Sequence, residues 1–185
     1  DAKRDPARLR NFNVSALVPD AFMQALQDDG DWRLVFGGET FRTVRARDLW
    51  DRLMRATYDV AEPGVIFIDR VNERNNLAGV EMISASNPCG EQMLPPYGAC
   101  LLGSINLARL VPHPFSADAG LDEEKLGELT RVAIRFLDNV IDVSRFPLPQ
   151  QETEAKAKRR IGLGVTGLAD ALVFCGARYG EEAAA

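Results

Sequence analysis

The stretch that decides this chain is residues 84–92, which read SASNPCGEQ. It sets an amide, a thiol and a carboxylate at alternate positions, Asn87, Cys89 and Glu91. Alternate side chains of an extended segment point to the same side, so we expect these three groups to face one small volume. A proline and a glycine flank the thiol, a pair that is typical of a tight loop tip. The stretch therefore indicates a reactive site.

A second thiol, Cys100, follows this stretch after residues 94–99, LPPYGA. That length would carry the chain around a hairpin and bring Cys100 back towards Cys89. The third thiol, Cys175, comes after an apolar segment near an expected helix end, where a buried and inert cysteine is the usual case.

Composition narrows the class of protein. The chain has 185 residues, of which 46% are hydrophobic and 26% are charged, enough for one soluble domain with a core. The net charge is −5 and no basic cluster forms a nucleic-acid groove. No apolar run approaches the ~20 residues of a membrane span, and no signal peptide is visible. We expect a cytoplasmic protein with no nucleic-acid or membrane partner.

The cysteines and the histidine do not suggest a metal site. The three cysteines form no CxxC pair, which argues against a disulfide scaffold or a zinc site. The single histidine, His113, stands between two prolines with no second ligand at a suitable spacing. The basic run at 156–160, KAKRR, is predicted to be a solvated helix face rather than a phosphate site.

Hydrophobic periodicity predicts helices that alternate with short apolar strands, a pattern typical of the α/β class. The strand at 65–68 is a continuous apolar run and is expected to be buried on both faces, whereas residues 72–77 are expected in a loop. Strands are predicted at 11–18, 32–36, 41–44 and 65–68 and from residue 99, and helices from Pro19-Asp20 and over 46–60, 121–146 and 166–174.

Residues 162–167, GLGVTG, satisfy the GxGxxG pattern of dinucleotide-binding loops. Such a site needs a strand directly before the glycines and an acidic residue ~20 positions later. A charged run precedes these glycines instead, so we do not predict a dinucleotide site.

Residues 87–92, NPCGEQ, and 94–107, LPPYGACLLGSINL, resemble the catalytic finger loop of ribonucleotide reductase large chains. The resemblance is strongest to the class II enzymes, which use adenosylcobalamin. It implies that residues 1–185 form part of the ten-stranded α/β barrel of these enzymes, with the finger loop at about 84–100. The chain begins without Met, so we expect an internal slice of the catalytic barrel domain. Similarity extends over almost the whole chain, including 11–23, 64–72 and 159–165, and is weakest at 111–123.

The resemblance also implies a role for each candidate residue. Cys89 would become a thiyl radical and take the 3′ hydrogen of the ribose, and Glu91 would accept the proton of the 3′-hydroxyl. Asn87 would hold the sugar hydroxyls. Cys100 would be one of two reducing cysteines that end as a disulfide. The second is expected upstream in the family, but no cysteine precedes Cys89 here, so the slice alone should be inactive.

The cofactor and partners follow from the same resemblance. It implies adenosylcobalamin, a ribonucleoside di- or triphosphate as substrate, and an external dithiol reductant such as thioredoxin. Nucleotide effectors would bind regions outside this chain, and an oligomer is compatible with the family. Among neighbouring polar residues, Asn13 and Ser15 are expected to face the substrate, and Asn106 is expected to anchor the exit of the loop.

Three alternatives stay open at this stage. The first is a class I large chain, which receives its radical from a separate subunit, although the sequence of residues 87–98 favours class II. The second is a two-electron thiol enzyme with Cys89 as nucleophile. Such thiols need a nearby histidine or positive charge, and His113 lies in a distant loop. The third is a non-catalytic interaction module.

Overall fold

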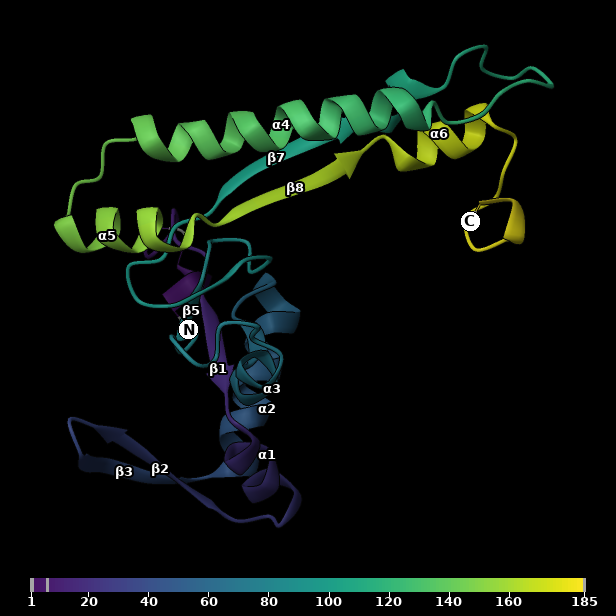
Figure 1. The fold of residues 1–185 in the computed structure, drawn as a ribbon. Helices are drawn as coiled ribbons and strands as arrows, with labels where there is room; N and C mark the ends of the chain where they lie inside the picture. The colour runs from purple at the N-terminus through teal and green to yellow at the C-terminus, as the bar shows by residue number, and fades with distance from the viewer. Residues whose placement is uncertain (1, 6, 185) are drawn as a thin grey trace. The chain divides into compact units, whose positions relative to one another are not determined.

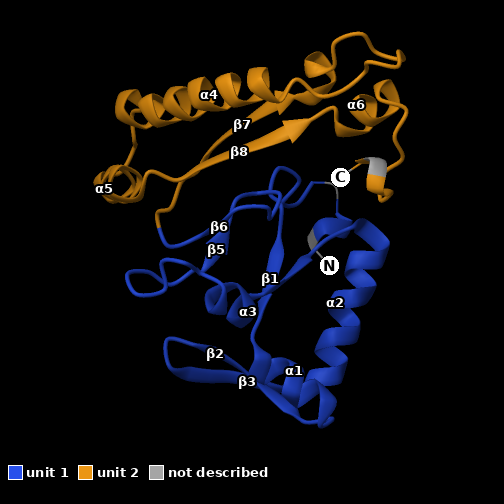
Figure 2. Ribbon diagram, turned by 45° about the vertical axis from the view of Figure 1, so that its right-hand side comes forward, with its two compact units in different colours: residues 1–96 blue, residues 97–185 orange. Residues whose placement is uncertain are grey.

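The computed structural model describes residues 2–5 and 7–184. These residues form two compact units, Asp1–Pro96 and Tyr97–Ala185, coloured separately in Figure 2. Each unit has its own strands, helices and buried hydrophobic cluster. The stretch with Cys89 belongs to the first unit, and Cys100 belongs to the second.

The first unit holds a parallel strand pair, β1 and β4, in the register Ser15↔Gly64 to Val18↔Phe67. An antiparallel hairpin, β2–β3, turns at Gly37 and Gly38, and a short antiparallel pair, β5–β6, encloses the Cys89 stretch. In chain order the elements are a 3-10 turn (Ala2–Arg4), β1 (Ser15–Val18), α1 (Asp20–Gln27), β2 (Asp31–Phe36), β3 (Glu39–Arg45), α2 (Ala46–Val60), β4 (Gly64–Phe67), α3 (Ile68–Glu73), β5 (Ala85–Ser86) and β6 (Met93–Leu94), most of which are labelled in Figure 1.

The core of the first unit lies where α1 and α2 meet the end of β1. Phe22 and Leu26 on α1 are buried together with Val18 on β1. The ring of Trp32 packs edge-on against Phe22, with centroids 5.2 Å apart. Because Val18 is the last residue of β1, this cluster fixes the end of the strand whose beginning lies near the Cys89 loop.

The second unit is built on a parallel pair, β7 and β8, with α4 lying along both strands (Figure 1). Asp122 caps α4 by accepting a hydrogen bond from the Lys125 amide at 2.8 Å. Gly103 on β7 lets the helix come close, since a Cβ there would lie 3.4 Å from Leu137 Cδ1. The elements are β7 (Leu101–Asn106), a 3-10 helix (Leu107–Leu110), α4 (Glu123–Val143), α5 (Pro149–Lys158), β8 (Ile161–Thr166), α6 (Leu168–Phe174) and a 3-10 turn (Glu182–Ala184).

Several predicted elements have the expected position, and α2 matches residues 46–60 at both ends. Two predictions around β1 and β4 are wrong in extent. β1 starts at Ser15 rather than at residue 11. Pro19 follows the end of β1 and cannot extend the ladder, so Ile68 has no partner on β1 and opens α3 instead.

Burial and two helix boundaries also differ from the prediction. In β4, Ile66 is buried but Phe67 is 44% exposed, because β4 pairs only with β1 among the described strands. Asn72, expected in a loop, lies in α3. Thr166 stays in β8 opposite Asn106, so the last helix starts two residues later than predicted.

The glycines of the GxGxxG pattern lie in β8 and directly after it, not in a loop that opens towards a ligand. Gly167 has a φ of +68°, and a Cβ there would collide with the Asn106 side-chain oxygen. That oxygen also accepts a hydrogen bond from the Ala108 amide at 3.1 Å. The last glycine therefore makes room for Asn106, which anchors the end of β7 as predicted.

The basic run at 156–160 was predicted to be a solvated helix face, which is correct for only part of it. Arg159 ends α5 in the left-handed conformation and reaches across to α4. Its Nε donates to Asp138 Oδ1 at 2.7 Å, and one terminal nitrogen donates to Asp142 Oδ1 at 2.9 Å. A further bond to the Asp138 carbonyl, at 2.9 Å, fixes the guanidinium plane. The fork joins the start of β8 to α4.

Replacing Arg159 with Gln is expected to lower the thermal midpoint of the full-length protein at pH 7. The hydrogen bonds of Arg159 hold the pKa of Asp138 and Asp142 below the usual carboxyl value. A lowered folded pKa stabilises the protein above about pH 3.9, and this contribution is lost as the pH falls through the folded values. Thermal unfolding at pH 7 and pH 3 should therefore show a gap between wild type and variant that narrows at pH 3.

The matched control is Arg131→Gln, which removes an exposed arginine from α4 itself. It should leave the midpoint almost unchanged at both pH values. An Arg159→Gln gap of equal size at pH 7 and pH 3 would contradict the ion-pair account.

Candidate catalytic loop

The Cys89 stretch is a tight turn rather than the extended segment predicted from the sequence. The Gly90 amide donates to the Asn87 carbonyl at 3.1 Å, and the Asn87 amide donates to the Gln92 carbonyl at 3.0 Å. Gly90 adopts a φ of +86°, which suits glycine. The chain therefore reverses over residues 87–92, earlier than the expected hairpin at 94–99, and Cys89 lies at the tip.

The turn still brings the predicted amide and carboxylate together. Asn87 Nδ2 donates to a carboxylate oxygen of Glu91. Asn87 Oδ1 accepts from the Gln92 amide at 2.9 Å, so the orientation of the side-chain amide is fixed from both ends. Glu91 remains exposed and can meet a ligand. The predicted meeting of three groups in one small volume is thus confirmed for Asn87 and Glu91, because of the turn and not the strand period, and for Cys89 it stays a prediction.

Cys89 is an exposed free thiol whose neighbour comes from a distant part of the chain. Asn13 Nδ2 lies 4.0 Å from the Cys89 sulfur, at the long end for a bond to this weak acceptor. Asn13 precedes β1 instead of lying on the strand, but it does face the loop that the sequence analysis singled out. The thiol therefore meets a neutral amide.

An open pocket of about 600 Å³ lies beside the loop, between it and the segment that leads into β1. Most of its polar lining consists of short amide and hydroxyl side chains, which can donate and accept hydrogen bonds without bringing charge. Such a lining suits the hydroxyl groups of a sugar. The polar residues of the lining are Asn11, Asn13, Ser15, Ser84, Ser86 and Asn87.

Asn72 holds the base of the loop through a pair of hydrogen bonds to one residue. Its Oδ1 accepts from the Ile83 amide at 2.8 Å, and its Nδ2 donates to the Ile83 carbonyl at 3.0 Å. Ile83 is 4% exposed, so water is a poor replacement for either bond. The next amide, Ser84, donates to the Leu94 carbonyl at 3.1 Å and starts the β5–β6 pairing. The sequence analysis missed Asn72, because nothing in its local pattern sets it apart.

Cys100 lies directly before β7 in the second unit and is half-buried. Its sulfur lies 3.7 Å from the Leu101 carbonyl oxygen. Burial raises the pKa of the Cys100 thiol, and the positive charge of Arg160 opposes that rise. The expected approach of Cys100 to Cys89 stays a prediction, since the two thiols belong to different units.

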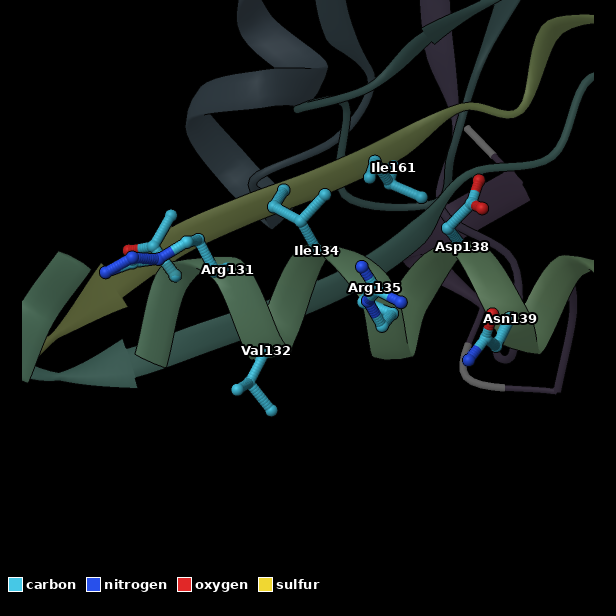
Figure 3. Close-up of a pocket in the computed structure, with 8 residues that line it drawn as sticks. Arg131, Val132, Ile134, Arg135, Asp138, Asn139 and Ile161 are labelled. Carbon is cyan, nitrogen blue, oxygen red and sulfur yellow. The ribbon is translucent and has the colours of Figure 1, made fainter. Parts of the chain in front are cut away.

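A second open pocket, of about 680 Å³, runs along α4 in the second unit (Figure 3). Ile134 points from α4 towards the start of β8, next to Ile161. Arg131 and Arg135 supply positive charge, while Asp138 is already bound by Arg159. None of the predicted catalytic residues lines this pocket, so we do not assign the chemistry to it.

Residues 1–185 match the protein family described as "Ribonucleotide reductase, barrel domain". The chain belongs to this family. The match confirms the α/β class, and the two parallel strand pairs agree with it. Within residues 2–5 and 7–184, no helix is long and apolar enough to cross a membrane. The same residues contain no group of three or more His, Cys, Asp or Glu side chains that could hold a metal ion.

Named relatives carry the comparison further. The chain is 44% identical over 181 residues to a "Vitamin B12-dependent ribonucleoside-diphosphate reductase" of Mycobacterium tuberculosis, covering 97% of this chain and 25% of the relative. A protein with the same name from Thermoplasma acidophilum is 40% identical over 167 residues, or 89% of this chain and 21% of the relative. A "Ribonucleoside-diphosphate reductase subunit alpha" of Chlamydia muridarum is 31% identical over 213 residues, or 97% and 20%. The chain thus spans a quarter or less of the length of these relatives.

Replacing Asn72 with Ala is expected to destabilise the loop, because the buried Ile83 amide and carbonyl lose their partner. Leaving such groups unsatisfied costs about 1–3 kcal/mol. Denaturant unfolding of the full-length protein should show the loss, and limited proteolysis should cut residues 84–100 faster. Asn76→Ala, an exposed position just after α3, is the control and should change neither measurement. Equal proteolysis rates in the two variants would rule out a stabilising role for the Asn72–Ile83 hydrogen bonds.

Proposed function

We propose that this chain carries the catalytic loop of a class II, vitamin B12-dependent ribonucleotide reductase. The full-length protein would reduce ribonucleotides to 2′-deoxyribonucleotides for DNA synthesis. The observation that carries the proposal is the loop itself, with Cys89 at the tip of a turn and Asn87 hydrogen-bonded to Glu91 beside it. The names of the relatives at 44% and 40% identity support the B12-dependent type over the type of the relative at 31%.

The chemistry explains why these groups are needed together. Direct displacement of the 2′-hydroxyl is very difficult, whereas a radical at C3′ makes the loss of water accessible. A Cys89 thiyl radical takes the hydrogen atom from C3′, so an S–H bond forms as the C–H bond breaks. Glu91 accepts the 3′-hydroxyl proton, for which it needs hydrogen-bond reach to the sugar. The exposure of this carboxylate at the loop surface supports that role.

The remaining steps need a reductant. The reducing thiol pair, which includes Cys100, gives a proton to the departing 2′-hydroxyl and a hydrogen atom to C2′. The hydrogen atom carries one electron of the pair, the second electron reduces the 3′-keto group left on the sugar, and the pair becomes a disulfide. Glu91 then returns its proton to the 3′ oxygen, and Cys89 returns the hydrogen atom to C3′. The thiyl radical is regenerated for the next turnover.

Asn87 is proposed to position the substrate. Its side chain is held by the Gln92 amide on one side and by Glu91 on the other. A pre-oriented amide loses little freedom when it binds a sugar hydroxyl, which favours a single reactive pose. The neighbouring polar pocket, with its serine and asparagine lining, would accept the rest of the sugar.

The described residues around the loop do not fit the proposed cofactor itself. Adenosylcobalamin is several times larger than a nucleoside, and the pocket of about 600 Å³, which short polar side chains line together with apolar ones such as Phe12, Leu17 and Ile66, is too small for the whole cofactor. We therefore derive no step through the cobalamin from this chain. The exposed Cys89 thiol is the group that would receive the radical.

The disulfide formed at each turnover sets a requirement for a partner. We propose an external dithiol of the thioredoxin type, acting in the cytoplasm, where thiols are kept reduced. Nucleotide effectors and an oligomeric state are proposed for the full-length protein on the family resemblance alone.

Replacing Cys89 with Ser in the full-length protein is expected to abolish deoxynucleotide formation, because a hydroxyl group does not form the corresponding radical under these conditions. The assay supplies adenosylcobalamin, a dithiol and a ribonucleotide, with no second subunit. Wild type should be active and should depend on the cobalamin. Glu91→Gln should lose roughly 10²–10⁴-fold in rate, the usual contribution of a general base.

Cys175→Ser is the matched control, since Cys175 packs beside the buried cluster of the second unit. It should retain activity. Turnover in Cys89→Ser would disprove the assignment of the loop. Wild-type activity that appears only after a radical-generating subunit is added would place the protein in class I.

A further inference from the structure

Cys100 and Arg160 are neighbours at one end of the β7–β8 ladder. The first residue pair of that parallel ladder is Leu101↔Ile161. The Leu101 amide also donates to the Arg160 carbonyl at 3.2 Å, so the two chains are already joined one residue earlier. Stepping back once from Leu101 and Ile161 sets Cys100 against Arg160.

The surroundings of Arg160 strengthen the effect of its charge. Arg160 is half-buried, and it lines a small cavity together with apolar side chains that include Leu101, Ile141 and Ala155. Apolar surroundings screen a charge less than water does. The charge of Arg160 opposes the burial that raises the pKa of the Cys100 thiol.

Several charged groups on α4 and α5 near this end of β7 are paired with one another. On α4, Asp138 and Asp142 bind Arg159. On α5, Lys158 pairs with Glu154 at 2.6 Å, and Lys156 pairs with Glu152 at 2.6 Å. These pairs balance opposite charges among themselves. Arg160 is the residue whose charge acts on the Cys100 thiol, so its effect on that thiol is the one to test.

We propose that Arg160 is a positioning residue for the reducing thiol, and that its guanidinium stabilises the thiolate of Cys100 during exchange with an incoming dithiol. The inference rests on the proposed function. In the exchange, a thiolate of the dithiol attacks the partner sulfur of the Cys100 disulfide. The old S–S bond breaks, a mixed disulfide forms, and Cys100 leaves as a thiolate that later takes a proton from water. A stabilised thiolate leaves faster.

Two kinds of variant separate the charge from the packing. The Arg160 carbonyl supports the ladder whatever the side chain, so Arg160→Gln and Arg160→Met keep that bond and remove the charge. Arg160→Lys keeps the charge. Circular dichroism of the full-length variants checks that each one folds.

The test is alkylation of the reduced full-length protein with iodoacetamide from pH 6 to pH 10, followed peptide by peptide. In Arg160→Gln and Arg160→Met, the Cys100 profile should move to higher pH. Alkylation near pH 7.5 should slow about threefold to tenfold, because loss of the positive charge raises the pKa of the Cys100 thiol. Arg160→Lys should restore the wild-type profile, and the Cys175 profile should not move in any variant.

Unchanged Cys100 profiles in both neutral variants would overturn the proposal, and so would an equal shift in Arg160→Lys. Misfolding of both neutral variants alongside a folded Arg160→Lys would make the charge a general requirement of the fold and would also overturn it. In the reductase assay, Arg160→Gln should need about threefold to tenfold more dithiol for half-maximal rate. If wild type shows no reductase activity, the proposed function fails, while the alkylation profiles still decide the link between Arg160 and Cys100.

Discussion

The site depends on one set of hydrogen bonds, those that close the turn around Asn87. The Asn87 backbone bonds to Gly90 and Gln92, and its side chain bonds to Gln92 and Glu91. One residue thereby sets the reversal of the chain, presents Cys89 at the tip and brings the carboxylate to the amide. Asn72, on α3, holds the base of the loop to the rest of the first unit through its two hydrogen bonds to Ile83. A reactive group on a loop needs such fixed support, since a small displacement of reacting atoms slows a reaction strongly.

Parallel strands give both halves of the chemistry their framework. β1 and β4 lie under the pocket beside Cys89, and β7 and β8 carry Cys100 at one end. Neither pair is covered on both faces within the described residues, and apolar side chains such as Phe67 and Val165 remain exposed. This exposure suits strands of a larger barrel, in which further strands and helices complete the burial. In the second unit, the hydrogen bonds from Arg159 to Asp138 and Asp142 join α4 to the start of β8 without any contribution from further strands.

Long amphipathic segments were the easiest features to predict from sequence. The bounds of α2 were correct because its apolar residues recur at helical spacing for fifteen residues. The Cys89 stretch was proposed as the site from its residue types and its family resemblance, which remains a proposal, whereas its shape was not predicted. Strand periodicity suggested an extended segment, whereas local hydrogen bonds of Asn87 favoured a turn. Contacts such as Asn13 with Cys89, or Arg159 with Asp138, join residues far apart in the chain, and no local pattern reveals them.

The two candidate thiols have surroundings that match two different reactions. Hydrogen-atom transfer moves no net charge, so it needs an accessible sulfur with a neutral neighbour, and Cys89 is exposed beside the Asn13 amide. Thiol–disulfide exchange passes through a thiolate, whose stability depends on nearby charge. Cys100 is half-buried directly before β7, and the positive charge of Arg160 acts on its thiol. A neutral setting for the first sulfur and a positive one for the second would keep radical transfer and reduction on separate residues, although both are cysteines.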